Sequence, residues 1–180
     1  DESCLRIIMK LSEYGVFQTP TLTINTFDSR RFYADSEWRE TYKDLPEAAE
    51  KDWMDGSIRL SANDVTENAM KFDEWSLSLV RTMHEEGVKI IAGTDTPIGY
   101  LTPGYSLHKE LELLSEAGLS NLEVLKSATI TPSEFFGLED KMGTIEAGML
   151  ADLVILNQNP LESISNTQDI HLVIAKGYIQ

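Results

Sequence analysis

One aspartate, Asp95, directly follows a short apolar run of the chain. The run covers residues 88–93 (VKIIAG) and has the length and the glycine boundaries typical of a strand that is buried on both faces. Parallel α/β sheets place functional groups just beyond the C-terminal ends of their strands. A carboxylate there can ligate a cation, act as a general base or bind a substrate amine. It can also cap the turn before Pro97, so the spacing alone leaves both interpretations open.

The three histidines of the chain are too scattered to form a zinc site by themselves. His108 lies at the start of a predicted helix, where an ordinary, partly exposed position is the simpler interpretation. His84 lies inside a long amphipathic helix, and His171 begins a strand. The sequence contains no H-x-H, H-E-x-x-H, C-x-x-C or G-x-S-x-G motif and no glycine-rich phosphate loop. Several well-marked enzyme classes are therefore excluded as self-contained interpretations.

Helices and strands alternate along the first 142 residues. Apolar spacing predicts a helix over 2–13, a short strand over 16–22 and a polar loop over 23–30. Helices broken at Pro46 are expected over 32–54. This order favours parallel βα units, as in a barrel or a doubly wound sheet.

Three capping boxes are predicted to start the later helices. The boxes pair Asp64 with Glu67, Ser120 with Glu123, and Thr131 with Glu134. The first starts the longest helix, which should end at Gly87, and another helix is expected over 106–116.

The last 38 residues have a different pattern from the rest. Turn-forming residues over 143–148 precede predicted strands at 152–156 and 172–175, and Lys176-Gly177 forms a tight turn into Tyr178-Ile179. We therefore predict two units, residues 1–142 and residues 143–180, the second a small antiparallel β element.

Composition restricts the possible partners. The net charge is −15 and the pI is about 4.5, which disfavours binding to nucleic acid or to anionic membranes. No apolar run approaches the roughly 20 residues that span a bilayer. The single cysteine, Cys4, permits no disulfide within the chain. The chain starts Asp-Glu-Ser without Met or a signal peptide, so we expect a processed or excerpted product and leave its localisation open.

Several segments together resemble the C-terminal part of the amidohydrolase superfamily. They are "GTDT" at 93–96, "LHKELELL" at 107–114, the pattern G-x-I-E-x-G-x-x-A-D-L-V-I-L over 143–156, and more faintly "GVFQTPTL" at 15–22. The imidazolonepropionase-related and Xaa-Pro-dipeptidase-like enzymes are the closest branch.

The resemblance implies a fold and a site. The fold would be α/β, comprising the last two βα units of a (β/α)₈ TIM barrel and part of a small β-sandwich. Asp95 would lie at the end of the eighth strand, where the family's aspartate binds a divalent metal and moves a proton from water to the leaving group. Zinc is the default ion, one or two per site. The family's other ligands are an H-x-H pair, often a lysine, and two histidines, and they lie outside this chain. His108 would at most line the substrate pocket.

The function expected from the resemblance is metal-dependent hydrolysis of C–N bonds in amides, cyclic amides or dipeptides. The chain would be the C-terminal portion of such an enzyme, inactive without the missing N-terminal barrel half, and a homo-oligomer is possible. The alternative is a noncatalytic binding or assembly protein that keeps the amidohydrolase frame. The presence of Asp95 in a "GTD" context favours the enzyme.

Overall fold

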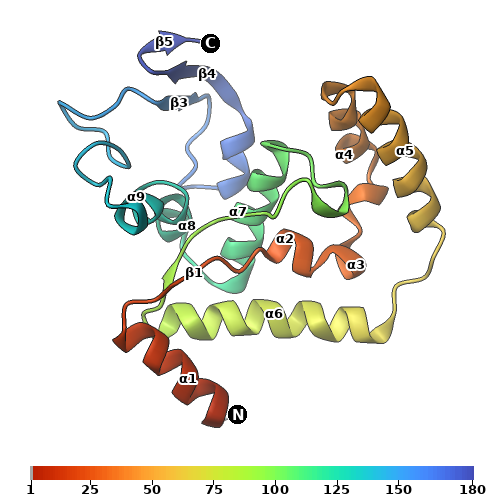
Figure 1. Cartoon of the computed structure of the whole chain (residues 1–180), viewed down its shortest axis with the longest axis horizontal. Helices are drawn as coiled ribbons and strands as arrows, with labels where there is room; N and C mark the ends of the chain where they lie inside the picture. The colour runs from red at the N-terminus through yellow and green to blue at the C-terminus, as the bar shows by residue number, and fades with distance from the viewer. Residues whose placement is uncertain (1) are drawn as a thin grey trace.

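The computed structural model describes residues 2–180 and shows a mixed α/β chain (Figure 1). In chain order its elements are α1 (Glu2–Glu13), β1 (Phe17–Gln18), α2 (Leu22–Asn25), α3 (Phe27–Arg30), the 3₁₀ turn η1 (Phe32–Ala34), α4 (Ser36–Glu40), η2 (Thr41–Asp44), α5 (Glu47–Ser61), α6 (Glu67–Glu85), β2 (Lys89–Ile90), η3 (Ile98–Tyr100), α7 (Tyr105–Ala117), α8 (Asn121–Ser127), α9 (Ile130–Phe136), β3 (Leu153–Leu156), η4 (Ile164–Gln168), β4 (Ile170–Ala175) and β5 (Tyr178–Ile179).

The strands β1 and β2 pair in parallel, although 70 residues of helix and loop lie between them in the order β1–α2–α3–α4–α5–α6–β2. Phe17 lies opposite Lys89 and Gln18 opposite Ile90, and the Ile91 amide donates to the Gln18 carbonyl at 2.8 Å. Both strands are shorter than predicted. On the β1 side the chain reaches Pro20, which has no amide to donate, and then turns into α2.

The main hydrophobic core joins β2 to the helices around it. In Figure 1 the long α6 runs along one side of the molecule, with α7 above it and α1 at one end. The buried core residues are Ile8, Leu22, Val80, Met83, Val88, Ile90, Leu111, Leu113, Leu114, Ala117, Leu119, Val124 and Ile164. Burying a large aliphatic side chain of this kind stabilises the fold by roughly 1.5–3 kcal/mol.

A second, aromatic core holds the segment between α3 and α6. Trp38 and Tyr42 are buried with Leu101, and Trp53, Tyr100 and Tyr105 pack against them. Pro46 directly precedes α5, as predicted. This segment therefore packs on the residues that follow β2.

Three sequence predictions about local structure are wrong. Residues 23–30 are not a loop but lie mostly in α2 and α3. The helix α6 is capped by Thr66, whose side chain accepts from the Ala69 amide, and not by Asp64. The helix α9 has no side-chain cap, because the chain is already helical at Ile130 and so passes Thr131 inside the helix.

Other predicted helix boundaries are confirmed. Ser120 and Glu123 form a complete capping box at the start of α8. The helix α7 ends at Gly118, whose φ of 115° suits glycine.

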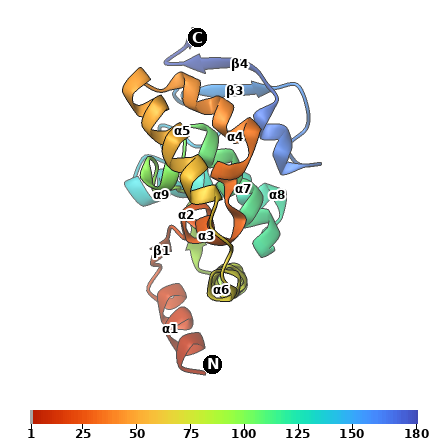
Figure 2. The ribbon, with the colours of Figure 1, turned by 90° about the vertical axis from the view of Figure 1, so that its right-hand side faces the viewer.

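The C-terminal strands form the predicted antiparallel sheet in the order β3–β4–β5. Lys176 and Gly177 both have positive φ in the tight turn between β4 and β5, and the Lys176 amide donates to Asp152 at 2.6 Å. Figure 2 shows this sheet at the end of the molecule opposite to α1. Within residues 2–180, no helix is both long and apolar enough to cross a membrane.

Candidate functional site

Asp95 lies in the turn just after β2, with an exposed side chain and a φ of 55°. The Ile98 amide donates to the Asp95 backbone carbonyl at 3.0 Å, and the Thr96 hydroxyl donates to the Leu101 carbonyl. Among residues 2–180 the Asp95 carboxylate has no hydrogen-bond or ion-pair partner. The turn is therefore held by backbone and threonine groups, and capping does not account for an aspartate at this position.

The Asp95 turn packs against the segment that follows β1. A Cβ added to Gly93 would lie 2.5 Å from Thr19 Cγ2, so only glycine allows this approach. Gly99 has a φ of 64°, and a Cβ there would lie 2.8 Å from Ile24 Cδ1. Gly93, two residues before the aspartate, thus permits this close approach.

The aromatic core contacts the residues that follow the same turn. The Trp38 indole donates to the Tyr100 carbonyl at 3.0 Å, and the hydroxyls of Thr41 and Thr102 lie 2.6 Å apart. Gly56 of α5 has no side chain, and a Cβ there would lie 2.2 Å from the Tyr100 hydroxyl. Residues of α4, η2 and α5 therefore contact the residues that follow Asp95 and fix the backbone there.

A second carboxylate, Glu110, was not among the predicted site residues. It lies in α7 with no exposed surface. One oxygen accepts from the Leu22 amide at 2.9 Å, and the other accepts from the Thr23 amide at 2.7 Å and the Thr23 hydroxyl at 2.6 Å. The sequence did contain a signal, because Glu110 shares its helix face with Leu113, Leu114 and Ala117, all of them buried.

The environment of Glu110 changes its acidity. Burial raises the pKa of Glu110 to about 7, against the hydrogen bonds from Thr23 and Leu22, which lower it. The negative charge of Asp95 raises this pKa further.

His108 lies on α7 and contacts the C-terminal part of the chain. Its Nδ1 lies 3.0 Å from the Thr167 hydroxyl, which donates to the Ile164 carbonyl at 2.8 Å. Burial lowers the pKa of His108. No hydrogen bond or ion pair within the described residues joins His108 to Asp95, and its role in substrate binding stays a prediction.

Asp95 fits a metal site as one ligand of several. Its carboxylate is exposed at the C-terminal end of a parallel strand and is not used by a neighbouring side chain. In the part of the chain that the structure describes, no group of three or more His, Cys, Asp or Glu side chains could hold an ion. The predicted metal would therefore need ligands beyond those that residues 2–180 bring together.

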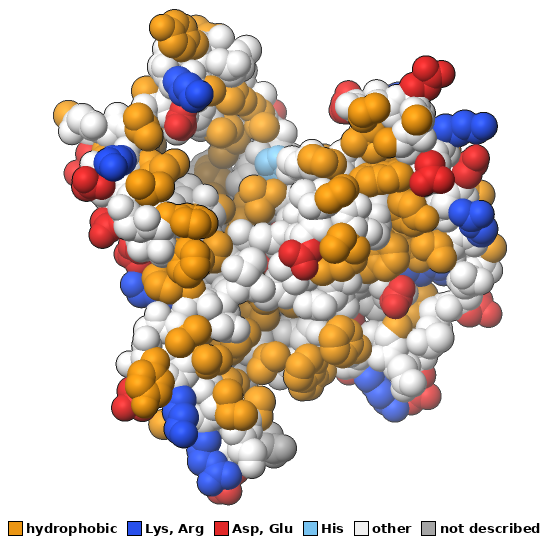
Figure 3. Space-filling view, in the orientation of Figure 1, with side chains coloured by type: hydrophobic (Ala, Val, Ile, Leu, Met, Phe, Trp, Pro, Cys, Tyr) orange, Lys and Arg blue, Asp and Glu red, His pale blue; other side chains and the backbone are white. Residues whose placement is uncertain are grey.

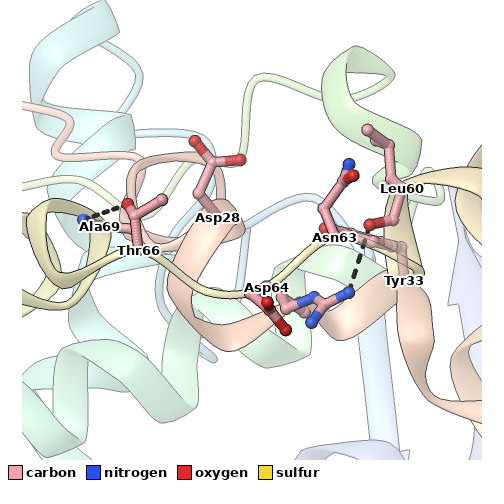
Figure 4. A pocket seen from close by; sticks show the side chains of 8 residues that line it. Asp28, Tyr33, Leu60, Asn63, Asp64, Thr66 and Ala69 are labelled. Atoms are coloured by element: carbon pink, nitrogen blue, oxygen red, sulfur yellow. Dashed lines mark hydrogen bonds between the residues drawn. The ribbon is translucent and has the colours of Figure 1, made fainter.

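Two cavities lie apart from the predicted site residues. One, of about 220 Å³, lies between α3 and the α5–α6 connection and is lined by Asp28, Arg31, Tyr33, Leu60, Asn63, Asp64, Thr66 and Ala69 (Figure 4). The other, of about 300 Å³, borders β2 and is lined by residues that include His84, Lys89, Glu123 and Glu134. Neither wall contains Asp95 or His108. The donors of Arg31 are partly used, since its Nη2 donates to the Leu60 carbonyl at 3.2 Å.

Comparison with known proteins gives one family for most of the chain. Residues 41–179 match the model of the Amidohydrolase family. The chain is 42% identical over 60 residues to an imidazolonepropionase of Thermoplasma acidophilum, and this match covers 32% of this chain and 15% of that enzyme. It is 36% identical over 76 residues to a 5'-deoxyadenosine deaminase of Methanobrevibacter smithii, and this match covers 41% of this chain and 18% of that enzyme.

A solved structure matches nearly the whole chain. It is a Xaa-Pro dipeptidase with methionine bound in its active site, similar over 96% of this chain with a TM-score of 0.67 and 27% identity. The match covers 36% of the dipeptidase chain. The chain thus spans less than a fifth of the curated relatives and just over a third of this structure.

Proposed function

The chain belongs to the amidohydrolase family, and from that premise we propose that it is the C-terminal part of a metal-dependent hydrolase of C–N bonds. The observation that carries the proposal is the placement of Asp95. Its carboxylate is exposed, is not used by the turn that contains it, and follows β2 of a parallel pair. That is the edge at which parallel α/β folds carry catalytic groups.

We assign β1 and β2 to the seventh and eighth strands of a (β/α)₈ barrel. Their parallel register and the helical segment between them support this assignment, as does the similarity to the Xaa-Pro dipeptidase over 96% of the chain. A barrel of this kind takes about 250 residues. The remaining strands, and the other metal ligands, would come from the N-terminal barrel half. Residues 1–142 would then be the barrel portion and residues 143–180 part of a β-sandwich.

The proposed chemistry gives Asp95 a proton-transfer role. A bound divalent cation, zinc by default, supplies Lewis acidity that lowers the pKa of water toward neutrality. The Asp95 carboxylate would serve as one ligand, accept the proton that the attacking water loses, and deliver it to the leaving nitrogen. The turn hydrogen bonds of Thr96 and Ile98 hold the Asp95 backbone in place during that transfer.

The substrate class follows from the family rather than from pocket contacts. Three relatives are named as a Xaa-Pro dipeptidase, an imidazolonepropionase and a deaminase. We propose a small amide, cyclic amide or dipeptide, with His108 at the pocket wall. Assembly into a homo-oligomer belongs to the same proposal.

The test is the replacement Asp95→Asn in the full-length protein. The amide keeps the shape of the carboxylate but cannot accept the proton, so we expect hydrolysis to fall by at least about 100-fold while the circular dichroism spectrum is unchanged. Metal content is measured in parallel. Asp64→Asn, an exposed aspartate at the start of the α6 region, is the matched control.

The outcomes separate the enzyme from the noncatalytic alternative. Loss of turnover in Asp95→Asn but not in Asp64→Asn supports the assignment. Undiminished turnover in Asp95→Asn removes Asp95 from the reaction. A wild-type protein that binds no metal and hydrolyses none of the amides and dipeptides would favour a binding or assembly protein.

A further inference from the structure

Glu110 fixes the start of the segment that follows β1. It reaches 87 and 88 residues back along the chain to accept hydrogen bonds from Thr23 and Leu22. These two amides are at the start of α2 and would otherwise have no partner inside that helix. Three hydrogen bonds to one buried carboxyl group hold both donor residues in place, because leaving these donors unpaired inside the protein would cost free energy. The α7 helix thereby sets the position of α2.

The fixed segment in turn contacts the turn that holds Asp95. Thr19 lies against Gly93, two residues before Asp95, and Ile24 of α2 lies against Gly99, four residues after it. The Asp95 carbonyl accepts from the Ile98 amide, which joins the aspartate to the part of the turn next to Gly99. A continuous set of contacts therefore leads from Glu110 through α2 to both sides of Asp95.

We propose that Glu110 is a positioning residue that holds the β1–α2 segment against the Asp95 turn and so sets the position of the Asp95 carboxylate. This inference rests on the proposed function for its catalytic consequence. It adds a residue that neither binds the metal nor touches the substrate. The carboxylate of Glu110 is engaged on both oxygens by α2, which leaves it no role in direct contact with a ligand.

The first test is Glu110→Gln in the full-length protein. The amide nitrogen of Gln cannot accept a hydrogen bond, so at least one of the Leu22 and Thr23 donors loses its partner. We expect kcat to fall about 10- to 100-fold, the loss typical of a small displacement of a catalytic group, with a change in KM below about threefold and unchanged metal content. Glu116→Gln is the control on the same helix, because Glu116 is exposed and Arg30 keeps its bond to Asp73.

Hydrogen exchange supplies a readout that does not depend on activity. In Glu110→Gln we expect faster native-state exchange in two segments, residues 22–26 and residues 95–101, with no change in α8. A role confined to folding stability would instead accelerate exchange across the whole core. Gly99→Ala is the second variant, since its Cβ presses on Ile24 from the other end of the same contacts. It should lower kcat in the same way.

The outcomes distinguish this inference from the proposed function. A kcat in Glu110→Gln within twofold of wild type would overturn the positioning role. If the wild-type protein hydrolyses no amide or dipeptide, the proposed function fails, and exchange decides the inference alone. Faster exchange at 95–101 would then support it, and unchanged exchange there would overturn it.

Discussion

Glu110 makes stability depend on pH in a defined direction. Its pKa is raised from 4.5 to about 7 in the folded state, so the folded protein binds more protons than the unfolded chain between these values. The stabilisation is fully present below about pH 4.5 and is lost as the pH rises through about 7. Between pH 5 and pH 8 we expect wild type to lose about 2–3 kcal/mol relative to Glu110→Gln, which has no proton to release.

The pH dependence can be measured by urea unfolding of the full-length protein at pH 5, 6, 7 and 8, followed by tryptophan fluorescence. The difference in unfolding free energy between wild type and Glu110→Gln should change steadily over this range. Glu116→Gln is the control for charge on α7. Parallel pH curves for wild type and Glu110→Gln would contradict the expected titration.

The two carboxylates differ in how far the sequence could predict them. Asp95 was selected because its evidence is local, namely a strand-length apolar run, a glycine and a turn within eight residues. Glu110 was missed because its partners, Leu22 and Thr23, are 88 and 87 residues away, and no local pattern encodes that distance. Its place on the apolar face of α7 was the only available signal, and it indicates a buried carboxylate without naming its donors.

At the scale of the element, the cap of α6 provides a test between two neighbouring residues. Thr66 accepts from the Ala69 amide at 3.1 Å, whereas Asp64 makes no contact of that kind. We expect Thr66→Ala to lower the unfolding free energy by about 1 kcal/mol, the usual loss for a removed N-cap. Asp64→Ala, at an equally exposed position, should change it by less than about 0.5 kcal/mol. Equal losses in urea unfolding would mean that Thr66 is not the cap.

Capping boxes show why element boundaries are hard to predict from spacing. Three pairs had the same i, i+3 spacing, but only Ser120 with Glu123 forms the reciprocal bonds. At Asp64 the chain enters the helix two residues later than predicted, and at Thr131 it is already helical. Packing against the rest of the fold determines which of the helix starts allowed by the local sequence is used. The tight turn at Lys176-Gly177 was predictable because the positive φ values that it requires depend on the turn residues themselves.

At the scale of the whole molecule, the family and the α/β fold class were predicted from motifs that each lie within one short segment of the sequence. The packing of the segment between α3 and α6 was not predicted, because its aromatic side chains pack on Leu101 and Tyr100, which come some 60 residues later than Trp38. Long-range contacts also hold residues 23–30, predicted as a loop and found in α2 and α3, since Glu110 accepts from Thr23 and Asp73 accepts from Arg30. Most of the contacts that position Asp95 therefore come from residues distant in the sequence and cannot be predicted from its neighbours.

The surface of the described chain leads to the last prediction. Within residues 2–180, β1 and β2 pair only with each other, and exposed apolar side chains lie on nearby elements, with Ile7 of α1 61% exposed and Phe136 of α9 69% exposed. Figure 3 shows hydrophobic side chains over much of the visible face, including its centre. Unpaired strand edges and apolar surface of this kind favour pairing with further strands. If those strands are the rest of a barrel, the 180-residue chain alone should be loosely packed.

We expect the isolated 180-residue chain to bind the dye ANS strongly, to unfold over a broad range of urea and to self-associate at micromolar concentration. The full-length protein, which adds the proposed neighbouring strands, should bind less dye and unfold sharply under the same conditions. Sedimentation velocity and urea titration measure both properties. A monomeric chain with a sharp, cooperative transition would show that two parallel strands and these helices suffice for a stable core, and the barrel assignment of β1 and β2 would lose its physical support.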